Sequence, residues 1–180
     1  MRQSGYTFVE LLVVVVIVGA VAAAVVATQT SVDSEQTLDA AASEVAAAFR
    51  FARSEALRTG EPHGVDANSF SKRVRVYRLD TSVSPPVVDY SVRHPIDKKL
   101  YDLNFATDPF LEPVDLASVL FWFEGVMFPS GFCGFEASGT PKYEDFAGVH
   151  MLTSGTVTLT AGGETRTVSV APMNGRVTIQ

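Results

Sequence analysis

The stretch that decides the fold of this chain is residues 5–27, GYTFVELLVVVVIVGAVAAAVVA. It opens on Gly5 and carries one charge, at Glu10, before an uncharged run that begins at Leu11. About 20 consecutive apolar residues are enough for a helix to span a bilayer, so we expect residues 6–30 to form a transmembrane helix. A carboxylate at the edge of such a helix costs roughly 2.5–3.5 kcal/mol on insertion, which indicates that Glu10 has a partner or a function.

The helical pattern continues beyond the apolar run, where apolar residues recur at steps of three and four. These residues are Leu38, Ala42, Val45, Phe49, Ala52 and Ala56. No Pro or Gly interrupts the chain between Ala20 and Thr59, and Gly60 and Pro62 are typical stop signals. We therefore expect one helix over residues 6–59, roughly 80 Å long.

After this helix, apolar and polar residues alternate with a period of two, which is typical of β-strands. The clearest example is a hairpin over residues 156–170 with a Gly162-Gly163 turn. Residues 119–128, VLFWFEGVMF, are predicted to form a fully buried central strand or a contact surface. Residues 129–148 are rich in Gly, Ser and Pro, and we assign no strand to them. The expected fold class is α+β, with the long N-terminal helix packed on an antiparallel sheet of about six or seven strands.

Composition limits the classes of function. The chain has 180 residues, a net charge of −6 and one cysteine, Cys133. About 150 residues remain after the apolar run, which is one ordinary domain. An acidic chain repels phosphate, so nucleic acid is not an expected partner. A single cysteine excludes an internal disulfide and a Cys-based zinc site, and we expect Cys133 to be a buried thiol.

No group of residues in the sequence indicates catalysis or metal binding. The three histidines have no second ligand at helical spacing. Asp108, Glu112 and Asp115 lack the alternating spacing of a calcium loop, which favours a solvated acidic loop. The chain also has no nucleophile elbow, phosphate-binding loop or dinucleotide fingerprint. We therefore expect no catalytic residue, no metal and no cofactor.

The N-terminal sequence resembles the processing signal of type IV pilins and type II secretion pseudopilins, because Gly5 directly precedes an apolar run that carries Glu10. This resemblance implies that residues 1–5 are a leader and that a prepilin peptidase cuts between Gly5 and Tyr6. It also implies that Tyr6 becomes N-methylated, and that Glu10 pairs with the N-terminal amine of a neighbouring subunit in a helical filament.

The rest of the chain resembles the GspH/FimT branch of that family. The resemblance lies in ARSEALRTG at residues 52–60, FPSG at residues 128–131 and NGRV at residues 174–177. It implies a minor pseudopilin of a type II secretion system, held in the bacterial inner membrane by a single pass, with residues 31–180 as a periplasmic pilin-like domain. The implied partners are other pilins or pseudopilins, the prepilin peptidase and the inner membrane.

Gly175 and Arg176 form a candidate C-terminal motif, because the DNA-uptake members of this branch resemble the chain at this position. In those members further basic residues follow, whereas residues 177–180 of this chain add no positive charge. Useful duplex binding commonly involves roughly 6–10 phosphate contacts. We therefore expect no nucleic-acid binding.

Other interpretations of the N-terminal segment remain open. A conventional secretory signal could be cleaved after an A-x-A pattern at residues 20–22 or 22–24, which would favour a secreted enzyme. A plain membrane anchor is a further interpretation, and both leave Gly5 and Glu10 unexplained. Among filament proteins, the alternative to a pseudopilin is a minor pilin of a type IV pilus, acting in assembly or in DNA uptake.

Overall fold

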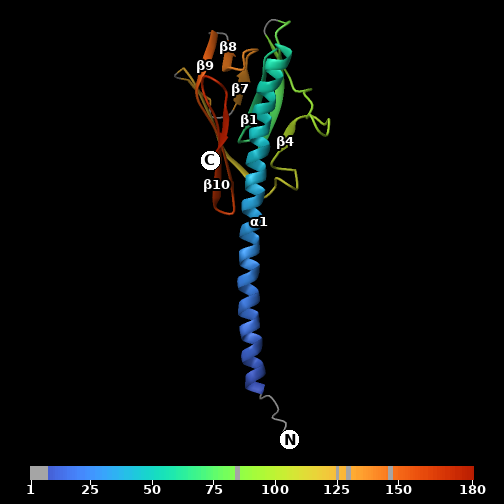
Figure 1. Cartoon of the computed structure of the whole chain (residues 1–180), viewed down its shortest axis with the longest axis vertical. Helices are drawn as coiled ribbons and strands as arrows, with labels where there is room; N and C mark the ends of the chain where they lie inside the picture. The colour runs from blue at the N-terminus through green and yellow to red at the C-terminus, as the bar shows by residue number, and fades with distance from the viewer. Residues whose placement is uncertain (1–7, 84–85, 125, 129–130, 146–147) are drawn as a thin grey trace.

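The fold begins with one long helix. The computed structural model describes residues 8–83, 86–124, 126–128, 131–145 and 148–180. Helix α1, Phe8–Thr59, has 52 residues; its N-terminal part projects alone, and its C-terminal part packs on the sheet (Figure 1). Gly60 follows with a φ of +74° and donates its N–H to the Ala56 carbonyl, which ends the helix where the sequence predicted.

The apolar stripe of α1 forms one side of the core. All six residues of the predicted stripe are fully buried, so this prediction is confirmed. Phe49 is among the largest fully buried side chains, and its ring packs against that of Phe121 with 6.1 Å between ring centroids. Burial of a phenylalanine side chain contributes about 1.5–3 kcal/mol. The alanines of the stripe leave room for the strands to approach the helix backbone closely.

The other side of the core is a sheet in which every pairing is antiparallel. Within the described residues it has eleven strands, so the predicted number of strands was wrong. They are β1 (His63–Asn68), β2 (Arg73–Asp80), β3 (Val87–Asp89), β4 (Asp102–Asn104), β5 (Asp115–Phe123), β6 (Val126–Phe128), β7 (Gly131–Phe135), β8 (Pro141–Asp145), β9 (Gly148–Ala161), β10 (Glu164–Val170) and β11 (Val177–Ile179). Four of them have three residues each.

Strand β9 joins the two halves of the sheet. The strand order is β11-β10-β9-β8-β7-β1-β2-β3, with β4 also paired to β2, and β5 paired to both β9 and β6. The first residues of β9 pair with β8, and the later ones pair with β5 and β10. In the predicted hairpin of β9 and β10, Val157 and Leu159 are buried and the threonines between them are partly exposed, as the alternation indicated.

The apolar run at residues 119–128 is a hairpin of β5 and β6, and not a single strand buried on both faces. Val119, Phe121 and Phe123 are fully buried, whereas Trp122 on the opposite face is 41% exposed. Glu124, at the turn, has a φ of +41°. The interpretation of this run as a fully buried central strand was therefore wrong, because the side chains of β5 alternate between the core and the solvent.

Strands β7 and β8 occupy the Gly-rich segment to which we assigned no strand. Gly64 of β1 lies opposite both Gly134 of β7 and Tyr77 of β2. A Cβ on Gly64 would lie 2.5 Å from the phenol of Tyr77, and one on Gly134 would lie 3.2 Å from the same hydroxyl oxygen. The glycines thus make room for a tyrosine ring that lies across the sheet, and they do not mark a loop.

Candidate functional site

The N-terminal part of α1 is an apolar helix without a packing partner among the described residues of this chain. Its large apolar side chains from residue 8 to residue 21 are between 49% and 80% exposed. They follow one another without a polar face, and helices of this kind are normally buried against other helices or lipid. Within the described residues, no helix is both long and apolar enough to cross a membrane. The transmembrane helix over residues 6–30 therefore stays a prediction.

Of the three residues predicted to act in processing and assembly, Glu10 alone lies in the described residues. Glu10 is exposed in the first turn of α1. Gly5 and Tyr6 lie outside the described residues, as does the rest of the expected leader. The proposed roles of these three residues stay predictions.

Strand β2 and the residue before it carry the densest cluster of basic side chains in the sequence, and each of these side chains lies beside a carboxylate. Every basic residue of the strand and of the position before it forms an ion pair: Lys72 with Asp115, Arg73 with Asp102, Arg75 with Asp66, and Arg78 with Asp89 and Glu61. The hydrogen bond from Arg73 to Asp102 raises the pKa of Arg73. Arg75 also lies 3.9 Å above the ring of Tyr90. These side chains are held by their neighbours, and they leave little positive charge for phosphate.

Three arginines without a carboxylate partner among the described residues gather elsewhere. Nine of the ten arginines in the sequence lie in the described residues, and five of these nine form ion pairs with carboxylates. The other four are Arg50, Arg53, Arg93 and Arg176. Arg50, Arg53 and Arg176 line one hollow of about 410 Å³, together with Asn174, Gly175 and Val177. We call this site the arginine hollow, and no acidic residue of the described chain lines it.

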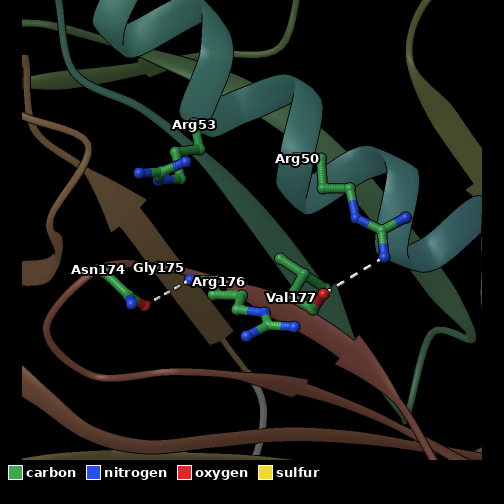
Figure 2. Close-up of a pocket in the computed structure, with 6 residues that line it drawn as sticks. All are labelled: Arg50, Arg53, Asn174, Gly175, Arg176 and Val177. Carbon is green, nitrogen blue, oxygen red and sulfur yellow. Dashed lines mark hydrogen bonds between the residues drawn. The ribbon is translucent and has the colours of Figure 1, made fainter.

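Figure 2 shows how the arginine hollow is built from two distant segments. Arg50 and Arg53 project from α1 toward the C-terminal segment, and the side chain of Arg176 lies along that segment. One nitrogen of Arg50, Nη2, donates to the carbonyl of Val177 at 3.3 Å. A guanidinium has five N–H donors in a fixed fork, so Arg50 keeps most of its donors for a ligand.

Arg53 is fixed between two glycines. Its Nε donates to the carbonyl of Gly139 at 3.1 Å. A Cβ on Gly175 would lie 3.1 Å from Cδ of Arg53, 2.9 Å from the ring of Phe135 and 3.0 Å from the Gly139 carbonyl. Gly175 also has a φ of +59°, a conformation that favours glycine. The predicted Gly175-Arg176 motif therefore has a structural reason, which is close packing of the chain against α1.

The turn at Asn174 sets the position of Arg176. The Asn174 side-chain oxygen accepts the N–H of Arg176 at 3.0 Å, and the Arg176 carbonyl accepts the N–H of Ala171 at 2.9 Å. With the backbone held at both ends, the exposed side chain of Arg176 lies along the C-terminal segment, below Arg50 and Arg53 in the view of Figure 2. The sequence indicated Arg176, but Arg50 and Arg53 appeared there as nothing more than polar positions on a helix.

Replacement of Gly175 by alanine is expected to destabilise the domain. The positive φ and the contacts with Phe135 and Gly139 together should cost about 1–3 kcal/mol. Each kcal/mol corresponds to roughly 2–4 °C in Tm for a chain of this size. Thermal unfolding of the full chain in detergent, followed by circular dichroism, measures the change.

Gly60→Ala is the matched control, because Gly60 has a φ of +74° and an added Cβ would meet no described atom within 4 Å. It introduces the same kind of backbone strain without the contacts. Equal losses of Tm in the two variants would show that packing at Gly175 contributes nothing.

The surroundings of the remaining candidate residues, which are the acidic loop and Cys133, indicate structural roles. Among the described residues, no three His, Cys, Asp or Glu side chains gather to hold a metal ion. Of the acidic loop, Asp115 pairs with Lys72 at 2.6 Å and Asp108 accepts the N–H of Phe110. Cys133 is fully buried, as predicted, and burial raises the pKa of its thiol well above the ordinary value.

Comparison with known proteins gives one family match and several similar structures. The family described as the prokaryotic N-terminal methylation motif matches residues 1–26. Two structures of the minor pseudopilin EpsH from the type 2 secretion system of Vibrio cholerae each give a TM-score of 0.50, at 16% and 14% identity. They cover 79% and 80% of this chain, and 95% and 93% of their own. The type IV minor pilin FimU of Pseudomonas aeruginosa gives a TM-score of 0.46 at 17% identity, over 81% of this chain and 90% of its own. No curated protein sequence matches.

The N-terminal motif and the fold agree with each other. The motif covers the first turns of a long helix, and the helix packs on an antiparallel sheet as in EpsH. The chain thus combines the N-terminal methylation motif with a pilin-like fold. This fold is similar to that of the EpsH structures, and it confirms the α+β architecture predicted from the sequence.

Proposed function

We propose that the chain is a minor pseudopilin of a type II secretion system, a structural subunit of a periplasmic filament that drives protein export. The observation that carries this proposal is the bare apolar half of α1. Eleven large apolar side chains at residues 8–21 are exposed in the single chain. In a filament of similar subunits, neighbouring helices would cover them and recover about 25 cal/mol for each Å² removed from water.

The N-terminal residues have defined roles in this proposal. Cleavage after Gly5 removes a leader of residues 1–5 and frees the amine of Tyr6, which is then methylated. The helix over residues 6–30 anchors the subunit in the inner membrane, with residues 31–180 in the periplasm, until the subunit joins the filament. The methylation motif at residues 1–26 supports this order of events.

Charge favours a partnership with proteins over one with nucleic acid. The chain carries a net charge of −6, and the basic strand β2 is neutralised by carboxylates. The three arginines of the hollow fall well short of the roughly 6–10 contacts that useful duplex binding involves. We propose a structural role without enzyme activity, and the name of EpsH as a minor pseudopilin supports this choice of system.

Deletion of the gene in the bacterium that carries it tests the proposal. We expect exported proteins to accumulate in the periplasm and to fall in the culture medium, while surface pili stay at the normal level. The gene supplied in trans should restore export. Loss of pili with normal export would instead identify a type IV minor pilin. A deletion strain with normal export and normal pili would contradict a role in either kind of filament.

A further inference from the structure

We infer that the arginine hollow binds carboxylates of an acidic segment on a partner protein. The proposed function supplies the kind of partner, a neighbouring filament subunit. Three positive side chains, Arg50, Arg53 and Arg176, line one hollow of about 410 Å³ in which no acidic residue of the described chain takes part. The chain is otherwise acidic, and its other described arginines pair with carboxylates, with the exception of Arg93. Three unpaired guanidinium groups in one hollow therefore favour the binding of an anion.

The geometry of the arginine hollow suits carboxylate groups. Arg53 is held by its bond to the Gly139 carbonyl, and Arg50 by its bond to the Val177 carbonyl. Each bond engages one donor, so terminal N–H groups of both side chains remain for a ligand. Arginines held in this way lose less conformational freedom on binding than free side chains do. The planar fork of a guanidinium matches a carboxylate with two parallel hydrogen bonds.

The surroundings favour a protein ligand over nucleic acid. Met173 is next in the chain to Asn174 of the hollow, and its side chain is 87% exposed. Methionine and arginine are both enriched at protein interfaces. The positive charge is gathered in one hollow instead of following a groove along which a phosphate backbone could run. An acidic peptide segment, with one or two carboxylates in the hollow and apolar contact at its edge, fits these features.

Fluorescence anisotropy of the full chain in detergent tests the inference at low ionic strength. The probe is a labelled hexaglutamate peptide, and a labelled hexaglutamine peptide is its neutral counterpart. We expect saturable binding of the first and none of the second. Arg176→Gln and Arg50→Gln should each raise the dissociation constant about tenfold, since each removes one charge-assisted contact.

Arg93→Gln is the matched control. Arg93 is the one further described arginine without a carboxylate partner among the described residues, and its side chain donates to the Lys98 carbonyl. This variant makes the same change in net charge and should bind hexaglutamate within about twofold of the wild type. An equal loss in the Arg93 variant would overturn the inference, because binding would then follow net charge and not the arginine hollow.

Three further arms decide the nature of the ligand. Acetate or inorganic phosphate that displaces the peptide at an equal concentration of anionic groups would make the arginine hollow a small-ion site, and would overturn the inference. Tighter binding of a short DNA duplex than of hexaglutamate would overturn it as well. The third arm is the gene deletion described above. If the chain binds the peptide but its deletion leaves export and pili normal, the carboxylate site is supported and a filament subunit is rejected as its partner. If the deletion abolishes export but the chain does not bind the peptide, the carboxylate site is rejected and the proposed function is not.

Discussion

A chain with valine in place of Gly5 is expected to stay in the membrane as an uncut precursor. The resemblance of residues 5–10 to a prepilin signal implies cleavage after Gly5, where the absence of a side chain lets the backbone approach the peptidase closely. A branched side chain there should abolish cleavage. Intact-mass analysis of membrane protein should then find residues 1–5 on every chain, whereas the wild type is expected to begin at Tyr6 and to carry an extra methyl group.

Gln3→Val provides the control for this experiment, because it places the same side chain in the leader but away from the scissile bond. It should be processed as the wild type is. A wild-type chain that begins near Ala23 would contradict the prepilin interpretation and would favour a conventional secretory signal. Normal maturation of the Gly5 variant would mean that the peptidase does not require glycine.

Glu10→Ala is expected to give a folded protein that joins the filament poorly. In a bundle of apolar helices the Glu10 carboxylate is tolerable when the amine of a neighbouring subunit neutralises it. Removal of one partner from a buried ion pair costs about 3–5 kcal/mol. A loss of this size lowers incorporation more than about a hundredfold. The measured quantity is the share of the protein that is recovered with sheared filaments.

Glu44→Ala is the matched control, since Glu44 is an exposed glutamate on the part of α1 that packs on the sheet. It should enter filaments at the wild-type level. Both variants should unfold at the wild-type temperature, because neither side chain belongs to the buried core. Full incorporation of the Glu10 variant would contradict a role for this residue in assembly.

Helix α1 could be predicted almost completely, because the pattern that specifies it lies within one continuous stretch of the sequence. The stripe from Leu38 to Ala56 has a helical period, and every one of its six residues is buried. The hairpin of β9 and β10 could be predicted for the same reason, with its Gly162-Gly163 turn. Strands β7 and β8 could not be predicted. Glycine at position 134 makes room for the side chain of Tyr77, which lies 57 residues earlier in the sequence.

The arginine hollow could be predicted in part. Arg50 and Arg53 lie three positions apart and off the apolar stripe, so the sequence places them on one face of the helix. Nothing local indicates that the last strand reaches this face, because the bond between Arg50 and Val177 joins residues 127 positions apart. The ion pairs of β2 could not be predicted for a similar reason. The carboxylates of Asp102 and Asp115, which pair with Arg73 and Lys72, come from distant segments of the chain.

The bond between Arg50 and Val177 also affects how this sheet meets other chains. The carbonyls of Arg176 and Gln180 accept hydrogen bonds from β10 and the residue after it, and alternate carbonyls of a strand point to opposite sides, so the Val177 carbonyl points away from β10. An edge strand with unsatisfied carbonyls is a template on which a foreign strand can add. Here the helix supplies a guanidinium to that carbonyl. In the proposed filament, neighbouring subunits would therefore be hindered from joining their sheets edge to edge, and each domain would stay separate while the helices pack together.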